Sequence, residues 1–467
     1  MKPYLFSFCS LLAVLATSLS SADEFYVHPD GRDSNPGTIE QPFASITRAQ
    51  VAAAPGDTIW IRGGEYFFKG TEIATGILLD KSGEEGKRIN YWAYQDEIPI
   101  LDFYQLLTPA RIRGISVTGD WLHLRGIEIR GVQQILTNTN ESWAIRVEGG
   151  SHNIFELLNL HHNEGPRLFI SEGGHNLVLN CDSHHNYDPD RGGENADGFG
   201  GHASMEGNVF RGCRAWANSD DGYDLIHALG AHKIEHCWAW SNGFVPDTQE
   251  EAGNGGGFKM GGWLLNPERF PGHVAVHSVS HSLAFDNRVV GFNTNYHPGL
   301  VRFYNNTAFN NPQQFNLKVA QRQPKPVTHV LRNNVALGEA PPVSGIERFL
   351  PDDQFNSWNL IETGNVTSED FLSVVPKGVD GPRQPDGSLP QIDFMRPKPG
   401  SRLIDAGIDV RLPFKGKAPD LGAFETEQAT LISVPPERAI LPAPLPPRVA
   451  LAARTIEASC VAAPAFV

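Results

Sequence analysis

The sequence contains few charged residues and almost no helix-length apolar periodicity. Only 19% of its 467 residues are charged, whereas glycine occurs 47 times. An amphipathic helix needs apolar residues that recur about every 3.6 positions over several turns. Because that repeat is scarce, the composition disfavours a mainly helical protein. It predicts many short strands and turns, arranged in one long solenoid or in two to three ordinary domains.

Long apolar runs are missing after the first 22 residues. Residues 1–22 contain Lys2, then an apolar stretch, then small residues up to Ala22, which predicts a secretory signal peptide. No later stretch reaches the ~18 apolar residues of a membrane-spanning helix. We therefore expect a secreted monomer, extracellular or periplasmic, that has no membrane partner.

Positive charge is also in short supply. The chain has 38 lysines and arginines against 53 acidic residues, a net charge of −15. Proteins that bind nucleic acid neutralise phosphates with basic side chains, so we expect no nucleic-acid partner. An anionic substrate would have to meet a bound metal or locally basic groups. Candidates for the latter are Arg269, Arg288, Arg302 and Arg322.

A repeat occupies the middle of the chain. Five similar segments end in an asparagine, at Asn163, Asn186, Asn218, Asn242 and Asn287, and so are separated by 23, 32, 24 and 45 residues. These intervals predict coils of about 22 residues, an inserted loop within the interval of 32, and two coils within the interval of 45. The positions five and three residues before each asparagine are apolar or small, as on the inward face of a strand. The sequence therefore predicts an all-β parallel β-helix in which the asparagines form a ladder at a turn.

Three of the five cysteines share one position of this repeat. Cys181, Cys213 and Cys237 each stand five residues before a repeat asparagine. Consecutive coils would stack them in the interior as free thiols. A disulfide between two neighbours is the alternative, because strands ~4.8 Å apart do not exclude it by distance.

The two ends of the predicted β-helix differ from its middle. A short helix predicted over 44–54, between strands at 25–27 and 58–62, would cap the first coil. Residues 398–425 read as a closing segment that packs back on the last coils. The predicted domain therefore covers residues 23–425, and the Ala- and Pro-rich tail, 426–467, is expected to be poorly ordered.

Two further sets of side chains recur at matching positions of the coils. The histidine pairs His161–His162 and His184–His185 are predicted to stack outward at a turn, because no other ligand has the spacing of a zinc site. Three aromatic residues stand two before the repeat asparagines and form either a sugar platform or packing beneath a neighbouring loop: Trp216, Trp240 and Phe285.

Acidic residues cluster after two repeat asparagines. The motif NADGFG contains Asp197, and SDDGYD contains Asp220, Asp221 and Asp224. Stacked coils would bring the two motifs to one edge, where four carboxylates without a cation would repel one another. A solvated acidic turn is the simpler interpretation of DDG alone. The combination of both motifs predicts a Ca²⁺ site, because hard cations bind oxygen ligands.

A single lysine follows in the next part of the repeat. Lys259 lies within GNGGGFKMGG, where glycines allow another chain to approach closely. A surface lysine is the ordinary interpretation of such a residue. Next to a bound cation, however, a partly buried lysine can lose its proton and act as a base.

The motifs NADGFG, SDDGYD and GFKMGG, in this order and at these intervals, resemble the pectate lyases of polysaccharide lyase family 9. The resemblance covers about residues 23–425 and implies a right-handed parallel β-helix. It also implies that Asp197, Asp220, Asp221 and Asp224 bind Ca²⁺ and that Lys259 is the Brønsted base. The expected reaction is β-elimination in a polygalacturonate-like acidic polysaccharide, begun by removal of the C5 proton, with an alkaline optimum.

Two other functions remain open from the residues alone. A β-helical glycoside hydrolase of the polygalacturonase kind also presents NxD and DD motifs and would use paired carboxylates without calcium. A non-catalytic solenoid could bind carbohydrate and hold structural calcium. The sequence does not distinguish endo from exo action.

Overall fold

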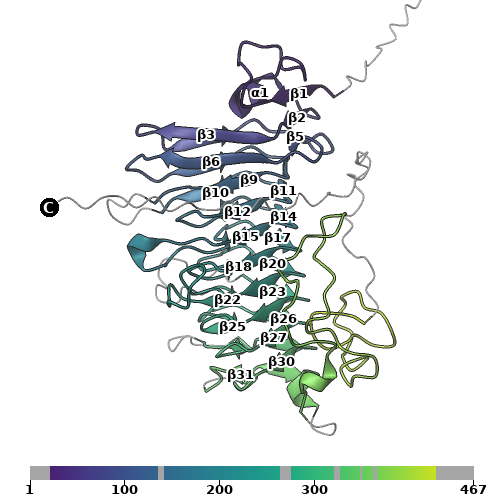
Figure 1. Ribbon diagram of the computed structural model, residues 1–467. Coiled ribbons are helices and arrows are strands. Elements are labelled where there is room, and N and C mark those ends of the chain that lie inside the picture. Colours follow the sequence, from purple (N-terminus) through teal and green to yellow (C-terminus); the bar gives the residue numbers. More distant parts are fainter. Residues whose placement is uncertain are drawn as a thin grey trace, which may run out of the picture.

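The computed structural model describes residues 22–134, 141–262, 275–319, 327–347, 350–360 and 365–426. In this part of the chain the strands wind into one elongated parallel β-helix, as predicted (Figure 1). Most coils contribute one strand to each of three parallel sheets, which we call the β1, β3 and β4 sheets after their first strands. None of the helices in the described residues has the length and apolar character of a membrane span.

The β1 sheet contains β1 (Glu24–Val27), β2 (Thr58–Ile61), β5 (Ile89–Ala93), β8 (Leu122–Arg125), β11 (Ile154–Glu156), β14 (Leu177–Leu179), β17 (Asn208–Arg211), β20 (His232–Glu235), β23 (His277–Ser280), β26 (Val301–Tyr304), β29 (Val330–Arg332) and β32 (Asp352–Gln354). The β3 sheet contains β3 (Gly64–Gly70), β6 (Pro99–Leu106), β9 (Glu128–Arg130), β12 (Asn159–His161), β15 (Asp182–His184), β18 (Arg214–Trp216), β21 (Trp238–Trp240), β24 (Leu283–Phe285), β27 (Thr307–Phe309) and β30 (Val335–Leu337). The β4 sheet contains β4 (Thr75–Leu79), β7 (Arg113–Val117), β10 (Trp143–Glu148), β13 (Leu168–Glu172), β16 (Phe199–Gly201), β19 (Tyr223–Asp224), β22 (Gly256–Lys259), β25 (Val290–Asn293), β28 (Phe315–Asn316) and β31 (Val343–Ser344). The helices are α1 (Ile46–Ala52), η1 (Pro189–Arg191), η3 (Ser357–Asn359) and η5 (Ser368–Asp370).

The coil register follows the repeat, with one correction. The positions aligned eight residues before the asparagines pair strand by strand, for example Phe155 with Val178 and Val178 with Phe210. The expectation that the 45-residue interval holds two coils is wrong. Asn242 donates from Nδ2 directly to Oδ1 of Asn287 at 2.9 Å, and β20 pairs with β23. This interval is therefore one coil with long connections around β22, which loops at a corner can absorb without changing the strand register.

The asparagine ladder forms as predicted and extends by one step. The Nδ2 group of each asparagine donates to Oδ1 of the next, from Asn163 through Asn287, and Asn287 donates to Asn311 at 3.1 Å. All of these side chains are buried, so each unmade bond would carry a full desolvation penalty. Two shorter ladders connect Asn153–Asn176–Asn208 and Asn306–Asn334–Asn356.

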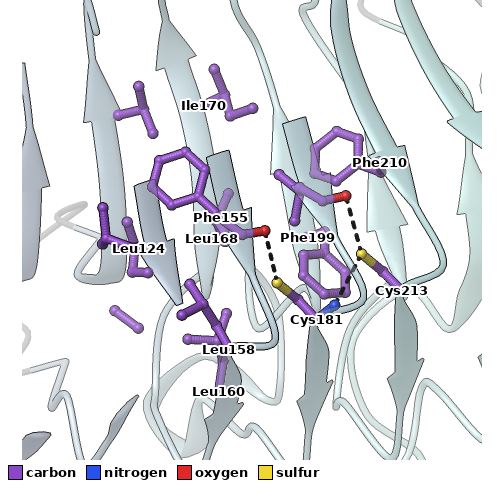
Figure 2. Close-up of a cluster of buried hydrophobic side chains, with 14 of the residues drawn as sticks. Leu124, Phe155, Leu158, Leu160, Leu168, Ile170, Cys181, Phe199, Phe210 and Cys213 are labelled. Carbon is purple, nitrogen blue, oxygen red and sulfur yellow. Dashed lines mark hydrogen bonds between the residues drawn. The ribbon is translucent and has the colours of Figure 1, made fainter. Parts of the chain in front are cut away.

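The three repeat cysteines are buried free thiols. Figure 2 shows two of them, Cys181 and Cys213, on neighbouring coils of the core. The Cys181 thiol donates to the carbonyl oxygen of Phe155 at 3.3 Å, and the Cys213 sulfur accepts from the Cys181 backbone N–H at 3.4 Å. Burial raises the pKa of both Cys213 and Cys237 well above the usual thiol value. The free-thiol interpretation is therefore confirmed.

A helix caps the N-terminal end of the β-helix, and the C-terminal segment packs against one side of it. Helix α1 follows Ser45, whose side chain accepts from the Arg48 N–H, and it covers the first coil as predicted (Figure 1). The segment 365–426 packs back along the β3 sheet, where Leu403 and Phe424 join a second apolar cluster. Residues 1–21 and 427–467, which hold most of the predicted signal peptide and the tail, lie outside the described residues.

The segment 365–426 decides between the two interpretations of the outward aromatic stack, a sugar platform or packing. The rings of Trp216 and Trp240 are parallel with centroids 4.9 Å apart, and the Phe285 ring stacks on Trp240 at 5.5 Å. The edge of Phe394 covers Phe285 at 4.9 Å, and Trp240 is only 6% exposed. At Trp240 and Phe285 the stack is packing and not a sugar platform. The histidine pairs also stack across coils, as His161 on His184 does at 5.1 Å.

Candidate active site

Three of the predicted calcium ligands meet on the outer face of the β4 sheet. Asp197 lies just before β16, Asp221 just before β19, and Asp224 ends β19. Carboxylate oxygens of these three residues lie within 4.8 Å of one another, and all three side chains are buried. The parallel register of β16 and β19 produces this convergence, because it pairs Gly200 with Asp224. The Asp221 N–H also donates to Asp197 Oδ1 at 3.2 Å.

Asp220 lies beside this group but makes a different set of contacts. Its two oxygens accept the backbone N–H groups of Asn195 and Asn254, each at 2.6 Å. It is not one of the three residues whose oxygens converge within 4.8 Å. The Asp220 carboxylate thus links the loop before β16 to the loop before β22, next to the three converging carboxylates.

Lys259 is the cationic side chain that contacts the converging carboxylates. It ends β22 and is paired in register with Asp224 on β19, one coil earlier. Its Nζ lies 3.0 Å from Asp221 Oδ2 and 3.0 Å from Asp224 Oδ2, and the residue is only 8% exposed. The repeat alone had placed this lysine one to two coils after the acidic cluster, and the structure places it in the next coil.

A glycine lets β22 approach the aspartates. The Gly256 N–H donates to Asp221 Oδ1 at 2.6 Å, and a Cβ atom at position 256 would lie 2.7 Å from that same oxygen. Any side chain here would displace the carboxylate. The run of glycines before the lysine therefore contributes directly to the geometry of the site.

Negative charge exceeds positive charge among these residues. Burial, together with the neighbouring carboxylates, raises the pKa of Asp197 well above its usual range, and burial raises the pKa of Asp221. Burial and the charge of Asp221 raise the pKa of Asp220 to about 8. Burial alone would lower the pKa of Lys259, but the charges of Asp221 and Asp224 dominate and raise it well above the ordinary lysine value. One ammonium group is thus shared by several buried acids.

This excess of buried carboxylate oxygens fits a hard divalent cation. Ca²⁺ takes six to eight oxygen ligands, and carboxylates supply them singly or in pairs. The residues that could hold it are Asp197, Asp221 and Asp224, with Asp220 alongside. The donor set contains no sulfur or imidazole, so it does not match a structural zinc site.

The arginines suggested by the sequence contribute little to this site. Arg288 binds Glu251 at 3.2 Å and the Gly253 carbonyl oxygen, next to the connection before β22. Arg302 lies on β26 in the β1 sheet, and Arg269 and Arg322 lie outside the described residues. Sequence reasoning missed Arg113 on β7 and Arg146 on β10 of the β4 sheet, because they precede Asp197 by 84 and 51 residues along the chain.

Comparison with known proteins identifies the family of the chain. A family described as "Pel9A-like, right handed beta helix region" matches residues 25–334. The chain belongs to this family. The match confirms the resemblance inferred from the three motifs and assigns the right-handed winding of the coils. The family is one of polysaccharide lyases, and its matched region contains every residue of the candidate site.

Relatives align along nearly the whole chain. Pectate lyase L of Dickeya chrysanthemi is 36% identical over 425 residues, which cover 88% of this chain and 92% of that protein. Pectate lyase PEL9 of Emericella nidulans is 33% identical over 426 residues, which cover 84% and 96%.

Two solved structures share the fold at similar identity. A rhamnogalacturonan lyase matches with a TM-score of 0.75 and 34% identity, over 81% of this chain and 97% of that one. Pectate lyase Pel9A matches with a TM-score of 0.72 and 33% identity, over 87% and 97%.

Proposed function

We propose that this polysaccharide lyase is secreted and cleaves pectate by calcium-dependent β-elimination, with Lys259 as the base. The observation that carries the proposal is the position of the Lys259 amine, 3.0 Å from two of three buried carboxylates that converge on one point. A base and a cation site in direct contact are what removal of a proton next to a substrate carboxylate requires.

Calcium would be held by Asp197, Asp221 and Asp224, with Asp220 beside them. When bound, it would offset the carboxylate charge that keeps Lys259 protonated and would stabilise negative charge that develops on the substrate carboxylate.

The protein's own residues supply the rest of the chemistry. Lys259 Nζ, freed from its carboxylate partners, would accept the C5 proton of a uronic acid residue, after which the bond to the 4-linked oxygen breaks. Burial excludes bulk water from the amine, which favours its neutral form. The absence of a side chain at Gly256 fixes β22 against Asp221, so the amine is positioned before substrate arrives.

The geometry favours elimination over hydrolysis. Retaining and inverting glycosidases separate their two carboxyl groups by ~5 Å or more, one on each side of the scissile bond. Here one oxygen from each of three carboxylates lies within 4.8 Å of the others, and two of the three carboxylates bind a lysine. This arrangement suits a shared cation better than an acid–base pair that flanks a sugar.

The substrate could be a homogalacturonan or a rhamnogalacturonan. Relatives named as pectate lyases align over most of the chain, but a structure named as a rhamnogalacturonan lyase matches as well as Pel9A does. Both polymers contain 4-linked galacturonate, so the same lysine and carboxylates would serve either one. Pectate is the primary proposal because more of the relatives are named for it.

An ultraviolet assay tests the proposal. The enzyme is mixed with polygalacturonate, highly methyl-esterified pectin or rhamnogalacturonan, with calcium or with a chelator in excess. Elimination creates an unsaturated product that absorbs in the ultraviolet, whereas hydrolysis creates only new reducing ends. We expect absorbance on polygalacturonate that disappears with the chelator and returns with added calcium. New reducing ends without absorbance would refute elimination.

A further inference from the structure

Outward positions of the β4 sheet form one continuous row that runs through the site. The register pairs Arg146 with Phe169, Phe169 with Gly200, and Gly200 with Asp224. Asp224 then pairs with Lys259. Arg146 is therefore three strands from Asp224, a distance of ~14 Å at the usual strand spacing. From Asp224 toward the N-terminal coils, the row therefore contains Gly200, then Phe169, then Arg146.

Arginines gather at the far end of this row. The guanidinium carbon of Arg146 lies 3.9 Å from the ring centroid of Trp143, and those of Arg111 and Arg113 lie at 5.7 and 5.9 Å. We call these three residues the arginine cluster: Arg111, Arg113 and Arg146.

Two acids that face the arginine cluster are Glu148 and Glu141. Glu148 binds Arg113 Nε at 2.8 Å and Arg146 Nε at 3.2 Å. Burial raises the pKa of the other acid, Glu141, against the opposing effect of the arginines. The strand register places Arg146 three strands from Asp224, so the arginine cluster lies beside the candidate active site. In a chain with a net charge of −15, three arginines around one tryptophan at this place are an exception.

Between the arginine cluster and the carboxylates the row holds Phe169 and Gly200, which carry no charge. A Cβ atom at Gly200 would lie 2.4 Å from a ring atom of Phe169, so position 200 must stay without a side chain. The edge of His202 meets the Phe169 ring at 4.5 Å, and burial lowers the pKa of His202 to about 3, so this imidazole is neutral at neutral pH.

We propose that the arginine cluster binds carboxylates of the acidic polysaccharide. The sugar chain lies along this row and extends from the cleaved bond toward the N-terminal coils of the protein. The inference rests on the proposed function. Guanidinium groups match carboxylates with two parallel hydrogen bonds, which a lysine cannot do. A sugar of an extended 4-linked chain is about as long as one strand spacing, so the cluster contacts a residue about three sugars from Asp224.

The test is the dependence of KM on substrate length. It uses Arg146→Met, which keeps an apolar stem on Trp143, and oligomers from trimer to hexamer of whichever polymer the wild type cleaves. We expect KM for the hexamer and the polymer to rise by about tenfold or more, because a charged hydrogen bond is lost. The KM of the trimer should stay near the wild-type value, and kcat should change little for every substrate.

Two further variants make the result specific. Arg211→Met removes an arginine that binds Glu235 at 2.9 Å on the β1 sheet, far from the row, and should leave every KM unchanged. Arg111→Met removes an exposed member of the arginine cluster and should repeat the length dependence if Arg146→Met does not fold. A KM for long substrates that stays at the wild-type value in both cluster variants would overturn the inference. Failure of the wild type to form unsaturated product would instead refute the proposed function.

Discussion

The contact between Lys259 and the carboxylates makes a prediction about calcium that does not depend on activity. The same oxygens of Asp221 and Asp224 that bind Lys259 Nζ at 3.0 Å are the proposed calcium ligands. A cation can use them fully only if these lysine contacts weaken. Replacing the lysine with methionine removes this competition and a like charge while keeping an apolar side chain of similar length.

The magnitude follows from the two hydrogen bonds. A hydrogen bond to a charged group contributes ~1.5–3 kcal/mol, so release from even one of them corresponds to about a tenfold change in affinity. We therefore expect Lys259→Met to bind Ca²⁺ about tenfold more tightly than the wild type, or more. Without calcium the variant should be less stable by ~3 kcal/mol or more, because buried carboxylates lose their only ion-paired lysine.

Calorimetric titration of calcium into both proteins, with melting temperatures measured in calcium and in chelator, tests these expectations. Lys233→Met is the matched control, because Lys233 is exposed on β20 of the β1 sheet. The control should bind calcium as the wild type does. Equal or weaker calcium binding by Lys259→Met would show that the lysine and the cation do not share these oxygens.

Three further predictions concern the fold. Asn218→Ala should lower the free energy of unfolding by ~2–5 kcal/mol, as chemical denaturation can measure. The buried Asn218 side chain donates to Asn242 at 3.1 Å, and its loss leaves the ladder asparagines on both sides without a hydrogen-bond partner. Burial alone would raise the pKa of Asp182, but two adjacent arginines lower it to about 2, below the unfolded value of ~3.9. The ionised Asp182 therefore stabilises the fold above about pH 4, and this stabilisation is lost as pH falls. Between about pH 5 and pH 2 the free energy of unfolding of the wild type should fall by ~2 kcal/mol more than that of Asp182→Asn. An equal fall in both proteins would refute this. Cys213 and Cys237 should resist alkylation in the native protein and react after unfolding, as mass spectrometry can follow; rapid native labelling would contradict their burial.

The strand register was largely predictable because each coil repeats the same chemistry. Apolar positions and the asparagine are spaced alike in each coil, and the register pairs them as the repeat indicates, for example Leu160 with Ser183 and Ser183 with Ala215. The 45-residue interval was misjudged because a coil and a long corner loop together have nearly the length of two coils. Spacing alone does not distinguish the two cases, since a corner loop leaves the stacked strands in place.

The site was predictable only in part. The order of the motifs indicated that Asp197 and Asp221 would lie in adjacent coils, and the structure places them so. It did not indicate that Asp220 would turn to accept two backbone N–H groups, because this depends on the conformation of two connecting segments. Nor did it reveal Arg146, whose proximity to the site depends on the register of three further strands.

The most direct measurement is the rate at which the wild type and Lys259→Met form unsaturated product from polygalacturonate at saturating calcium. Loss of a general base costs ~10²- to 10⁴-fold in rate. We predict a decrease in kcat of at least about 100-fold, while the variant still binds calcium and remains folded. A folded, calcium-loaded Lys259→Met that forms the product within a few-fold of the wild-type rate would contradict the assignment of Lys259 as the base.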